Sequence, residues 1–275
     1  MIMPGDPARD LPGTIVIVAP HMDDELIGCG ALLATDDVAS RAHVVYASDG
    51  SLSPTSPWPW HKTDRAALAE ARRNEAAKGL EQLGLPAGRA HFLDLPDGGL
   101  GSCRTELESR LLERLHALQP DHLLAPFRYD FHPDHLAVSQ AVRGLDQRGE
   151  VKAQLLEYFA YARWKLLPGQ DIRNHIRDDA LLCFEPGEEA RARKQRAFEA
   201  HASQTSRYYG WQKRVNLTPE FVAAHCAEAE FLVRPQPGEQ PDAIFLTSPQ
   251  WIRFVNAVEP RLKRAKDFVL AIVRG

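Results

Sequence analysis

The chain has 275 residues, of which 44% are hydrophobic and 25% are charged, and its formal net charge at pH 7 is -4. This composition is typical of a soluble globular protein that buries a full-sized core, as one large α/β domain or one domain with a modest appendage. Without a broad basic surface or a Lys/Arg-rich arm, direct nucleic-acid binding is disfavoured.

The four cysteines are far apart in the sequence and none belongs to a C-x-x-C pair. In a chain of this length they predict reduced thiols and not a disulfide framework. The first 13 residues contain no apolar stretch of signal-peptide length, and no run of about 18 apolar residues occurs. We therefore expect a cytoplasmic protein without a membrane span.

The first predicted strand is the apolar, β-branched run Thr14 to Ala19, and helical spacing begins at Leu26. Pro20 suits the end of a strand because it has no backbone donor. The turn between strand and helix contains four polar residues, His21, Asp23, Asp24 and Glu25. In an open α/β sheet, ligands bind at this carboxyl end of the strands.

Two interpretations of this turn are open from its residues alone. His21 and Asp24 are three residues apart, so an imidazole nitrogen and a carboxylate oxygen can both reach one zinc ion at about 2.0–2.2 Å. Asp23 would then act as a base on the attacking water. Alternatively, the three acidic residues cap the helix and complement its dipole.

The second predicted strand, residues 42–47, leads into Ser48-Asp49-Gly50-Ser51. The segment 52–63 that follows contains three prolines and both Trp58 and Trp60, so it is neither a regular helix nor a central strand. The two tryptophans either line a pocket in which sugar faces stack on indole, or pin the loop to the body by apolar burial.

Residues 64–83 form the most distinct predicted helix, with Asp64 at its start, Gly84 after its end and Arg72 along its length. A third strand over 91–93 precedes a turn that contains Asp97, and 105–118 is an amphipathic helix.

A second polar turn follows the predicted fourth strand, residues 123–126, and opens another helix. His132 and His135 share one helix face if the helix begins there, with Pro133 tolerated in the first turn. Two such turns in one α/β pattern favour convergence on a single metal ion.

The last third of the chain is less regular. We predict strands over 151–161 and 180–184, a charged helix over 186–204, a polar and aromatic lid or rim over 203–211, an edge strand over 230–234 and a basic amphipathic helix over 250–273. The last of these suits a scaffold or oligomer contact. The alternation of strands and helices predicts a mainly parallel sheet with right-handed crossovers.

The runs Pro20-His21-Met22-Asp23-Asp24-Glu25 and His132-Pro133-Asp134-His135 resemble the paired motifs of the LmbE-like, or PIG-L, family of zinc-dependent N-acetyl-sugar deacetylases. Further similarity is carried by Ser48 to Ser51, Arg72 with Glu75, Asp97-Gly98, and Lys194 with Ser203-Gln204. One departure is Met22, where the family usually has proline. Methionine is not a ligand for a nitrogen and oxygen site, so the change puts only the rigidity of the turn in doubt.

The resemblance implies a Rossmann-like three-layer fold and a role for each matching residue. His21, Asp24 and His135 would hold Zn²⁺, or another divalent ion such as Fe²⁺. Asp23 would be the general base, His132 an imidazolium facing the oxyanion and Asp134 the carboxylate that keeps it protonated. Arg72, Asp97 and Asp49 would bind substrate, and from the residues alone His132 and His135 are interchangeable.

The expected function is hydrolysis of an N-acetyl or other N-acyl group on an amino sugar or glycoconjugate. Two alternatives are a zinc amidohydrolase acting on a non-sugar amide and a non-catalytic sugar- or nucleotide-binding α/β protein. The expected organisation is an N-terminal tail (1–13), a deacetylase core (14–210) and a C-terminal α+β extension packed on it (211–275), and the protein can form homo-oligomers.

Overall fold

The computed structural model describes residues 3–56, 58, 60–130, 132–160 and 176–235. Their strands form an eight-stranded sheet in the order β1-β7-β8-β6-β5-β2-β3-β4. The strands are β1 (Met3–Pro4), β2 (Ile15–Ala19), β3 (Ala42–Ser48), β4 (Ala90–Leu95), β5 (His122–Pro126), β6 (Gln154–Tyr158), β7 (Leu181–Phe184) and β8 (Glu230–Val233). Neighbouring strands are parallel except at β8, which is antiparallel to both β6 and β7. The predicted mainly parallel α/β sheet is confirmed.

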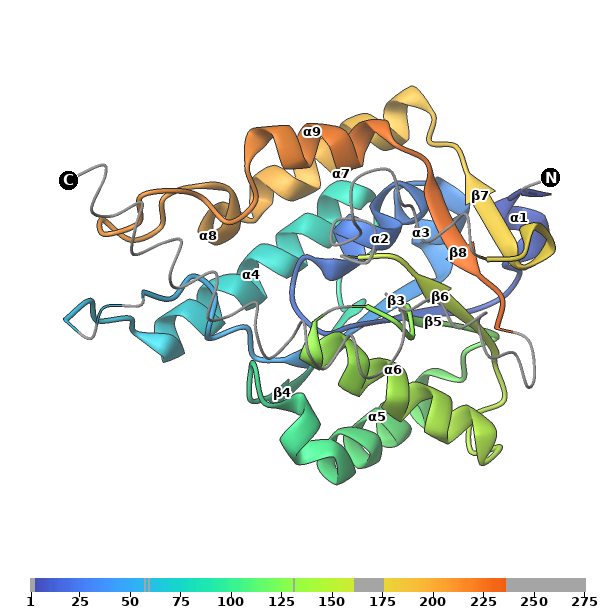
Figure 1. The fold of residues 1–275 in the computed structure, drawn as a ribbon. Helices are drawn as coiled ribbons and strands as arrows, with labels where there is room; N and C mark the ends of the chain where they lie inside the picture. The colour runs from blue at the N-terminus through green and yellow to red at the C-terminus, as the bar shows by residue number, and fades with distance from the viewer. Residues whose placement is uncertain (1–2, 57, 59, 131, 161–175, 236–275) are drawn as a thin grey trace.

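Helices cover both faces of the sheet (Figure 1). Successive side chains of β2 alternate between the faces: Ile15 and Ile17 pack in one apolar core with α2, α4, α7 and α9, and Val16 and Val18 pack in a second core with α5 and α6. The helices are α1 (Pro7–Asp10), α2 (Asp24–Leu33), α3 (Asp36–Arg41), α4 (Arg65–Leu83), α5 (Arg104–Leu118), α6 (Pro133–Gln147), α7 (Glu188–Ala200), α8 (Ala202–Thr205) and α9 (Pro219–Ala227), with 3₁₀ turns at Leu100–Cys103 and Asp178–Ala180. None of the helices in the described ranges combines the length and apolarity needed to span a bilayer.

Helix α4 begins and ends where the sequence predicts. The Asp64 side chain caps its first turn by accepting a hydrogen bond from the Ala67 amide at 3.0 Å. Gly84 ends it with a φ of 93°, a left-handed conformation that glycine adopts without steric cost.

The expectation of an edge strand over 230–234 is wrong. β8 lies inside the sheet and pairs on both sides. A four-residue apolar run does not reveal how many partners it has, because the partners come from distant parts of the chain. The helix predicted over 186–204 is also divided at His201 into α7 and α8, and the helix predicted over 250–273 lies outside the described residues.

The strand order places β2 at a switch point. The chain passes from β2 to β3 and β4 on one side, and then returns to add β5 and β6 on the other side of β2. At such a point the loops that follow the two central strands diverge, which leaves room for a ligand. Both polar turns follow strands at this point, one after β2 and one after β5.

Candidate metal centre

The first polar turn joins β2 to α2 and is almost fully buried. Asp24 is 0% exposed, and one of its oxygens, Oδ2, accepts a hydrogen bond from the His21 amide at 2.9 Å. Asp23 occupies the N-cap position of α2 but makes no capping hydrogen bond with its side chain. A pure capping role therefore does not explain Asp23.

Glu25 lies beneath this turn and not on the surface. Its carboxyl group accepts hydrogen bonds from the Asp23 amide at 3.2 Å and from the Tyr46 hydroxyl at 2.8 Å. Burial raises the pKa of Glu25 to about 8. This contact fixes the backbone that carries Asp23.

The second polar turn joins β5 to α6. His132 is the N-cap residue, and its Nδ1 accepts a hydrogen bond from the Asp134 amide at 3.2 Å. Pro133 follows at the first helical position, where its missing donor costs nothing. His135 is fully buried one turn further on.

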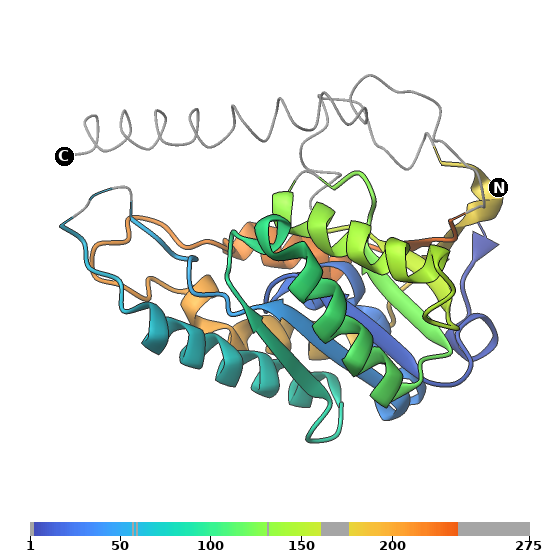
Figure 2. The same cartoon turned by 90° about the horizontal axis from the view of Figure 1, so that it is seen from below.

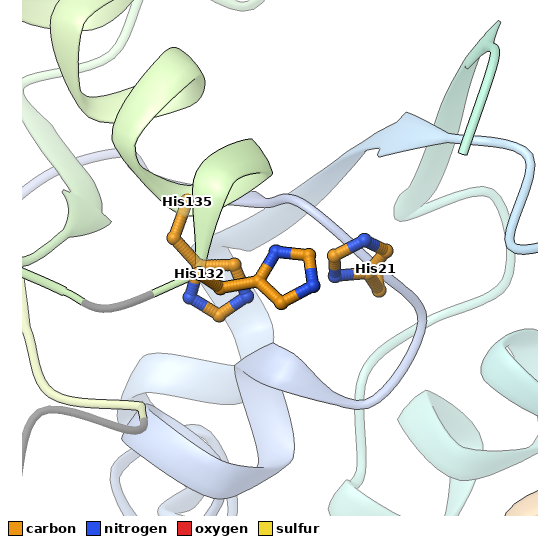
Figure 3. Close-up of side chains that lie close together, drawn as sticks. All are labelled: His21, His132 and His135. Atoms are coloured by element: carbon orange, nitrogen blue, oxygen red, sulfur yellow. The ribbon is translucent and has the colours of Figure 1, made fainter. Parts of the chain in front are cut away.

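The two turns bring three histidines together (Figure 3). Nitrogen atoms of His21, His132 and His135 lie within 4.8 Å of one another. Asp24 lies between two of them, because its Oδ2 is 3.1 Å from both His21 Nδ1 and His135 Nε2. The predicted convergence of the two motifs is therefore present.

These donors fit a divalent metal ion. Ligands at about 2.1 Å in tetrahedral geometry are about 3.4 Å apart, close to the separations observed around Asp24. The second oxygen of Asp24, Oδ1, is buried and has no hydrogen-bond partner among the described residues, which is costly unless a cation satisfies it. Imidazole nitrogen and carboxylate oxygen suit Zn²⁺ and other divalent ions of the first transition row.

Two further carboxylates lie against His21. Its Nε2 is 3.2 Å from Asp97 Oδ1 and 3.3 Å from Asp134 Oδ2, and these three residues form a second group able to hold a cation. Although burial opposes it, hydrogen bonds with Asp134, Asp24 and Asp97 raise the pKa of His21 well above its usual value.

The pKa values of two carboxylates of the first turn, Asp23 and Asp24, are shifted in opposite directions. Burial raises the pKa of Asp23 to about 6, although the charge of Arg72 opposes the rise. Burial acts on Asp24 in the same way, but the charges and hydrogen bonds of His135 and His21 outweigh it and hold the pKa of Asp24 well below its usual value. One carboxylate thus stays charged, whereas its neighbour can exchange a proton near neutral pH.

The surroundings of His132 oppose the charge that the sequence predicts for it. Burial lowers the pKa of His132 to about 3, and the charges of His135 and His21 act in the same direction, whereas the charges of Asp134 and Asp24 oppose the fall. Asp134, expected to keep His132 protonated, turns its carboxylate to His21 and accepts the amides of Gly98 and Leu100 at 2.8 and 3.1 Å. Since Nδ1 of His132 accepts a hydrogen bond, the neutral ring carries its proton on Nε2.

The three residues predicted to bind substrate occupy two different settings. Asp49 and Asp97 line a pocket of about 400 Å³ together with Ser51, Leu52, Arg65, Ala66, Ala69 and Pro96. Arg72 is 1% exposed; its guanidinium donates to the carbonyls of Met22 and Gly50 and lies 3.3 Å from Asp23 Oδ2. A substrate contact of Arg72 stays a prediction, whereas its observed partner is Asp23.

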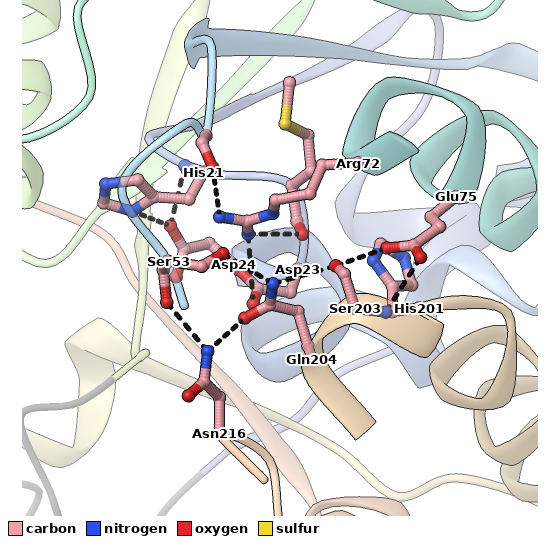
Figure 4. Close-up of polar contacts among 12 residues, drawn as sticks. His21, Asp23, Asp24, Ser53, Arg72, Glu75, His201, Ser203, Gln204 and Asn216 are labelled. Atoms are coloured by element: carbon pink, nitrogen blue, oxygen red, sulfur yellow. Dashed lines mark hydrogen bonds and ion pairs between the residues drawn. The ribbon is translucent and has the colours of Figure 1, made fainter. Parts of the chain in front are cut away.

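A second polar network lies beside Arg72 (Figure 4). Glu75, one turn along α4, accepts hydrogen bonds from the amide and hydroxyl of Ser203 at 2.8 and 2.6 Å. The Gln204 side chain donates to Ser203 Oγ and to the Ser53 carbonyl, both at 2.9 Å. This network ties the segment after α7 to the loop after β3.

Asp130 is a site residue that sequence reasoning missed. It is fully buried; its Oδ1 accepts a hydrogen bond from the His132 amide at 3.0 Å and lies 3.4 Å from His135 Nδ1. Burial opposes protonation of His135, but Asp24 and Asp130 raise the pKa of His135 to about 9. The sequence feature that could have identified Asp130 is its position two residues before His132.

Comparison with known proteins identifies the domain that carries these turns. Residues 16–145 match the profile of the PIG-L family, described as GlcNAc-PI de-N-acetylase. The chain is 40% identical over 90 residues to the 1D-myo-inositol 2-acetamido-2-deoxy-alpha-D-glucopyranoside deacetylase of Kineococcus radiotolerans, which is 32% of this chain and 24% of that protein. It is 29% identical over 169 residues to the 2'-N-acetylparomamine deacetylase of Streptomyces fradiae, which is 54% of this chain and 58% of that protein. The chain thus spans about a quarter and somewhat over half of these two relatives.

Solved structures share the fold. A conserved protein from Thermus thermophilus superposes with a TM-score of 0.56 at 22% identity, covering 84% of this chain and 98% of that one. The zinc-inhibited form of a teicoplanin deacetylase superposes with a TM-score of 0.55 at 19% identity, covering 80% and 97%. The match of residues 16–145 to the PIG-L, or LmbE-like, family agrees with the resemblance of the two motifs, and the solved structures show the same fold.

Proposed function

We propose that this LmbE-like domain is a metal-dependent hydrolase that removes an N-acetyl group from an amino sugar or glycoconjugate. The observation that carries the proposal is the position of Asp24 Oδ2, 3.1 Å from a ring nitrogen of both His21 and His135 at the switch point of the sheet. The sugar deacetylases among the relatives support the choice of substrate class.

His21, Asp24 and His135 would hold the ion. When bound, a divalent ion supplies Lewis-acid polarisation of the acyl oxygen and lowers the pKa of water. Asp130 would be a positioning residue, because a carboxylate on the far nitrogen of a liganding histidine fixes the ring and its tautomer.

Asp23 would remove a proton from the attacking water and return it to the departing amine. Its pKa of about 6 suits both transfers near neutral pH. Arg72 would position Asp23 through the 3.3 Å contact of Nη2 with Oδ2. His132 would donate from Nε2 to the acyl oxygen as negative charge develops there, acting as a neutral donor.

The test combines metal content with turnover. Protein purified without added metal is analysed for bound elements as wild type and as Asp24→Ala, and acetate release is measured on N-acetylated sugars and on acylated amino compounds. We expect about one divalent ion per wild-type chain, little in the variant, and acetate release that a chelator stops and Zn²⁺ restores.

The other outcomes separate the alternatives. Turnover confined to acylated amino compounds would identify a non-sugar amidohydrolase. Wild-type protein that binds no divalent ion, even after Zn²⁺ is added, would overturn the hydrolase mechanism and favour a binding protein.

A further inference from the structure

Aromatic side chains from two distant segments stack against one another beside the pocket. In the loop between β3 and α4, Trp58 and Trp60 stack with ring centroids 4.7 Å apart. His61 of this loop stacks on Trp211 at 5.4 Å, and Trp211 stacks on Tyr209 at 5.2 Å. Figures 1 and 2 both show these segments side by side at one end of the molecule. We call this surface, with Lys62, Arg65, Tyr208, Arg207 and Lys213, the aromatic–basic rim.

The rim is continuous with the candidate site. Its first segment leaves the 400 Å³ pocket at Leu52 and returns to it at Arg65, since both residues line the pocket. The second segment is fixed to the first by Asn216, whose side chain donates to Ser53 Oγ at 2.9 Å, and by Gln204 (Figure 4). These contacts hold the two segments of the rim together next to the pocket, which Arg65 of the rim also lines.

The apolar part of the rim is open to solvent. Trp60 is 65% exposed and Tyr208 is 39% exposed, and they are the two exposed large hydrophobic side chains of the described residues. Burial therefore does not explain Trp60, whose exposed ring is available to a ligand that extends beyond the pocket.

The rim is also basic, although the whole chain is acidic. Lys62, Arg65, Arg207 and Lys213 are exposed and form no ion pair with any residue that the structure describes. The nearby acidic side chain of the first segment, Asp64, caps α4. Exposed cations beside open aromatic faces suit a ligand that has both an anionic group and a flat ring.

We propose that the aromatic–basic rim binds the part of the substrate beyond the acetylated sugar, and that this part is a nucleoside diphosphate. The inference rests on the proposed function and names its substrate class. The base stacks on Trp60, and the diphosphate lies among the basic side chains, with Arg65 nearest the pocket. A neutral monosaccharide leaves the rim empty.

The test uses four probes with the same acetylated sugar: the methyl glycoside, the phenyl glycoside, the 1-phosphate and the uridine diphosphate ester. For metal-loaded wild type we expect kcat/KM for the phenyl glycoside to be about two- to tenfold higher than for the methyl glycoside. The 1-phosphate should also have a higher kcat/KM than the methyl glycoside, by a factor that added salt reduces. The uridine diphosphate ester should have the highest kcat/KM of the four. Trp60→Ala should remove the gain from the ring, with Trp60→Phe retaining part of it. Lys62→Glu with Arg207→Glu should remove the gain from the phosphate, whereas Lys152→Glu, an exposed change at the other end of the strands, should not.

The failures are distinguishable. If the methyl glycoside is hydrolysed and the nucleotide is no better, the rim proposal is wrong and the proposed function stands. If no probe is hydrolysed, the proposed function fails, and quenching of tryptophan fluorescence by uridine diphosphate alone tests the rim: absence of saturable quenching, or quenching unchanged in Trp60→Ala, overturns it. Binding to phosphatidylserine vesicles that Trp60→Ala abolishes, without nucleotide binding, would assign the rim to a lipid surface instead.

Discussion

Two buried groups of charged side chains differ in how completely the protein satisfies them. Lys194 and Glu230 form an ion pair of 2.7 Å, and the Glu230 carboxylate also accepts the amides of Ala31 and Leu32 at 2.7 Å each. Around His21, by contrast, three carboxylates lie within 3.3 Å of one ring, and one oxygen of Asp24 has no partner among the described residues. The Lys194–Glu230 pair is balanced in charge, and the polar atoms described above have partners within the protein, so we call it the closed pair. The group around His21 instead has more carboxylates than the nearby cations balance.

The two groups show that buried charge has two different consequences in this molecule. A closed pair fixes α7 and β8 against α2, and we expect it to affect stability alone. An excess of buried carboxylates destabilises the fold unless a cation binds among them. Proteins retain such destabilising groups mainly at functional sites. Substitutions in the two groups test this difference.

The largest effect is expected at His135. His135→Ala should empty the metal centre, because it removes a buried nitrogen 3.1 Å from Asp24. His132→Ala should retain the metal and lose turnover, since His132 is a donor to the reacting oxygen in our proposal. Elemental analysis of both variants is the measurement, and an empty site in His132→Ala would exchange the two assignments.

The next effect is expected at Asp23. Asp23→Asn should lower kcat by about 10²–10⁴-fold, the usual contribution of a general base, while metal content stays at the wild-type level. Asp64→Asn is the matched control, because asparagine also caps a helix and Asp64 lies outside the centre. Wild-type kcat in Asp23→Asn would remove Asp23 from the mechanism.

Lys194 tests the closed pair. Lys194→Met should lower the free energy of unfolding by about 3 kcal/mol, because it leaves Glu230 buried without its cation. The double variant with Glu230→Gln should recover part of this loss. Denaturant unfolding measures it, and metal content should be unchanged. A loss of metal in the single variant, with the fold intact, would contradict the separation of the two groups.

The smallest of these effects is expected at Asp130. Asp130→Asn keeps an acceptor for the His132 amide but removes the charge beside His135, so metal affinity should fall about 10–100-fold. Chelator competition measures the affinity, and the unfolding midpoint shows whether the fold is intact. Asp130→Glu should restore part of the affinity. Unchanged affinity in Asp130→Asn would assign Asp130 to the turn alone.

The local sequence pattern was sufficient to predict much of the fold. The apolar run before Pro20 and the cap residues Asp64 and Gly84 determine β2 and α4 through interactions within a few residues. The interior position of β8 and the contact of Arg72 with Asp23 were not predictable in this way, because their partners lie in distant parts of the chain.

By itself the sequence determined which residues can form the centre: two strand-to-helix turns with histidine and aspartate at ligand spacing. Only the tertiary structure decided how they act. Burial and the surrounding charges lower the pKa of His132 and raise that of Asp23, and the packing of the second turn places Asp130 against His135. Spacing along a chain sets which groups can meet, whereas charge state depends on the water excluded and the neighbours acquired when distant segments pack.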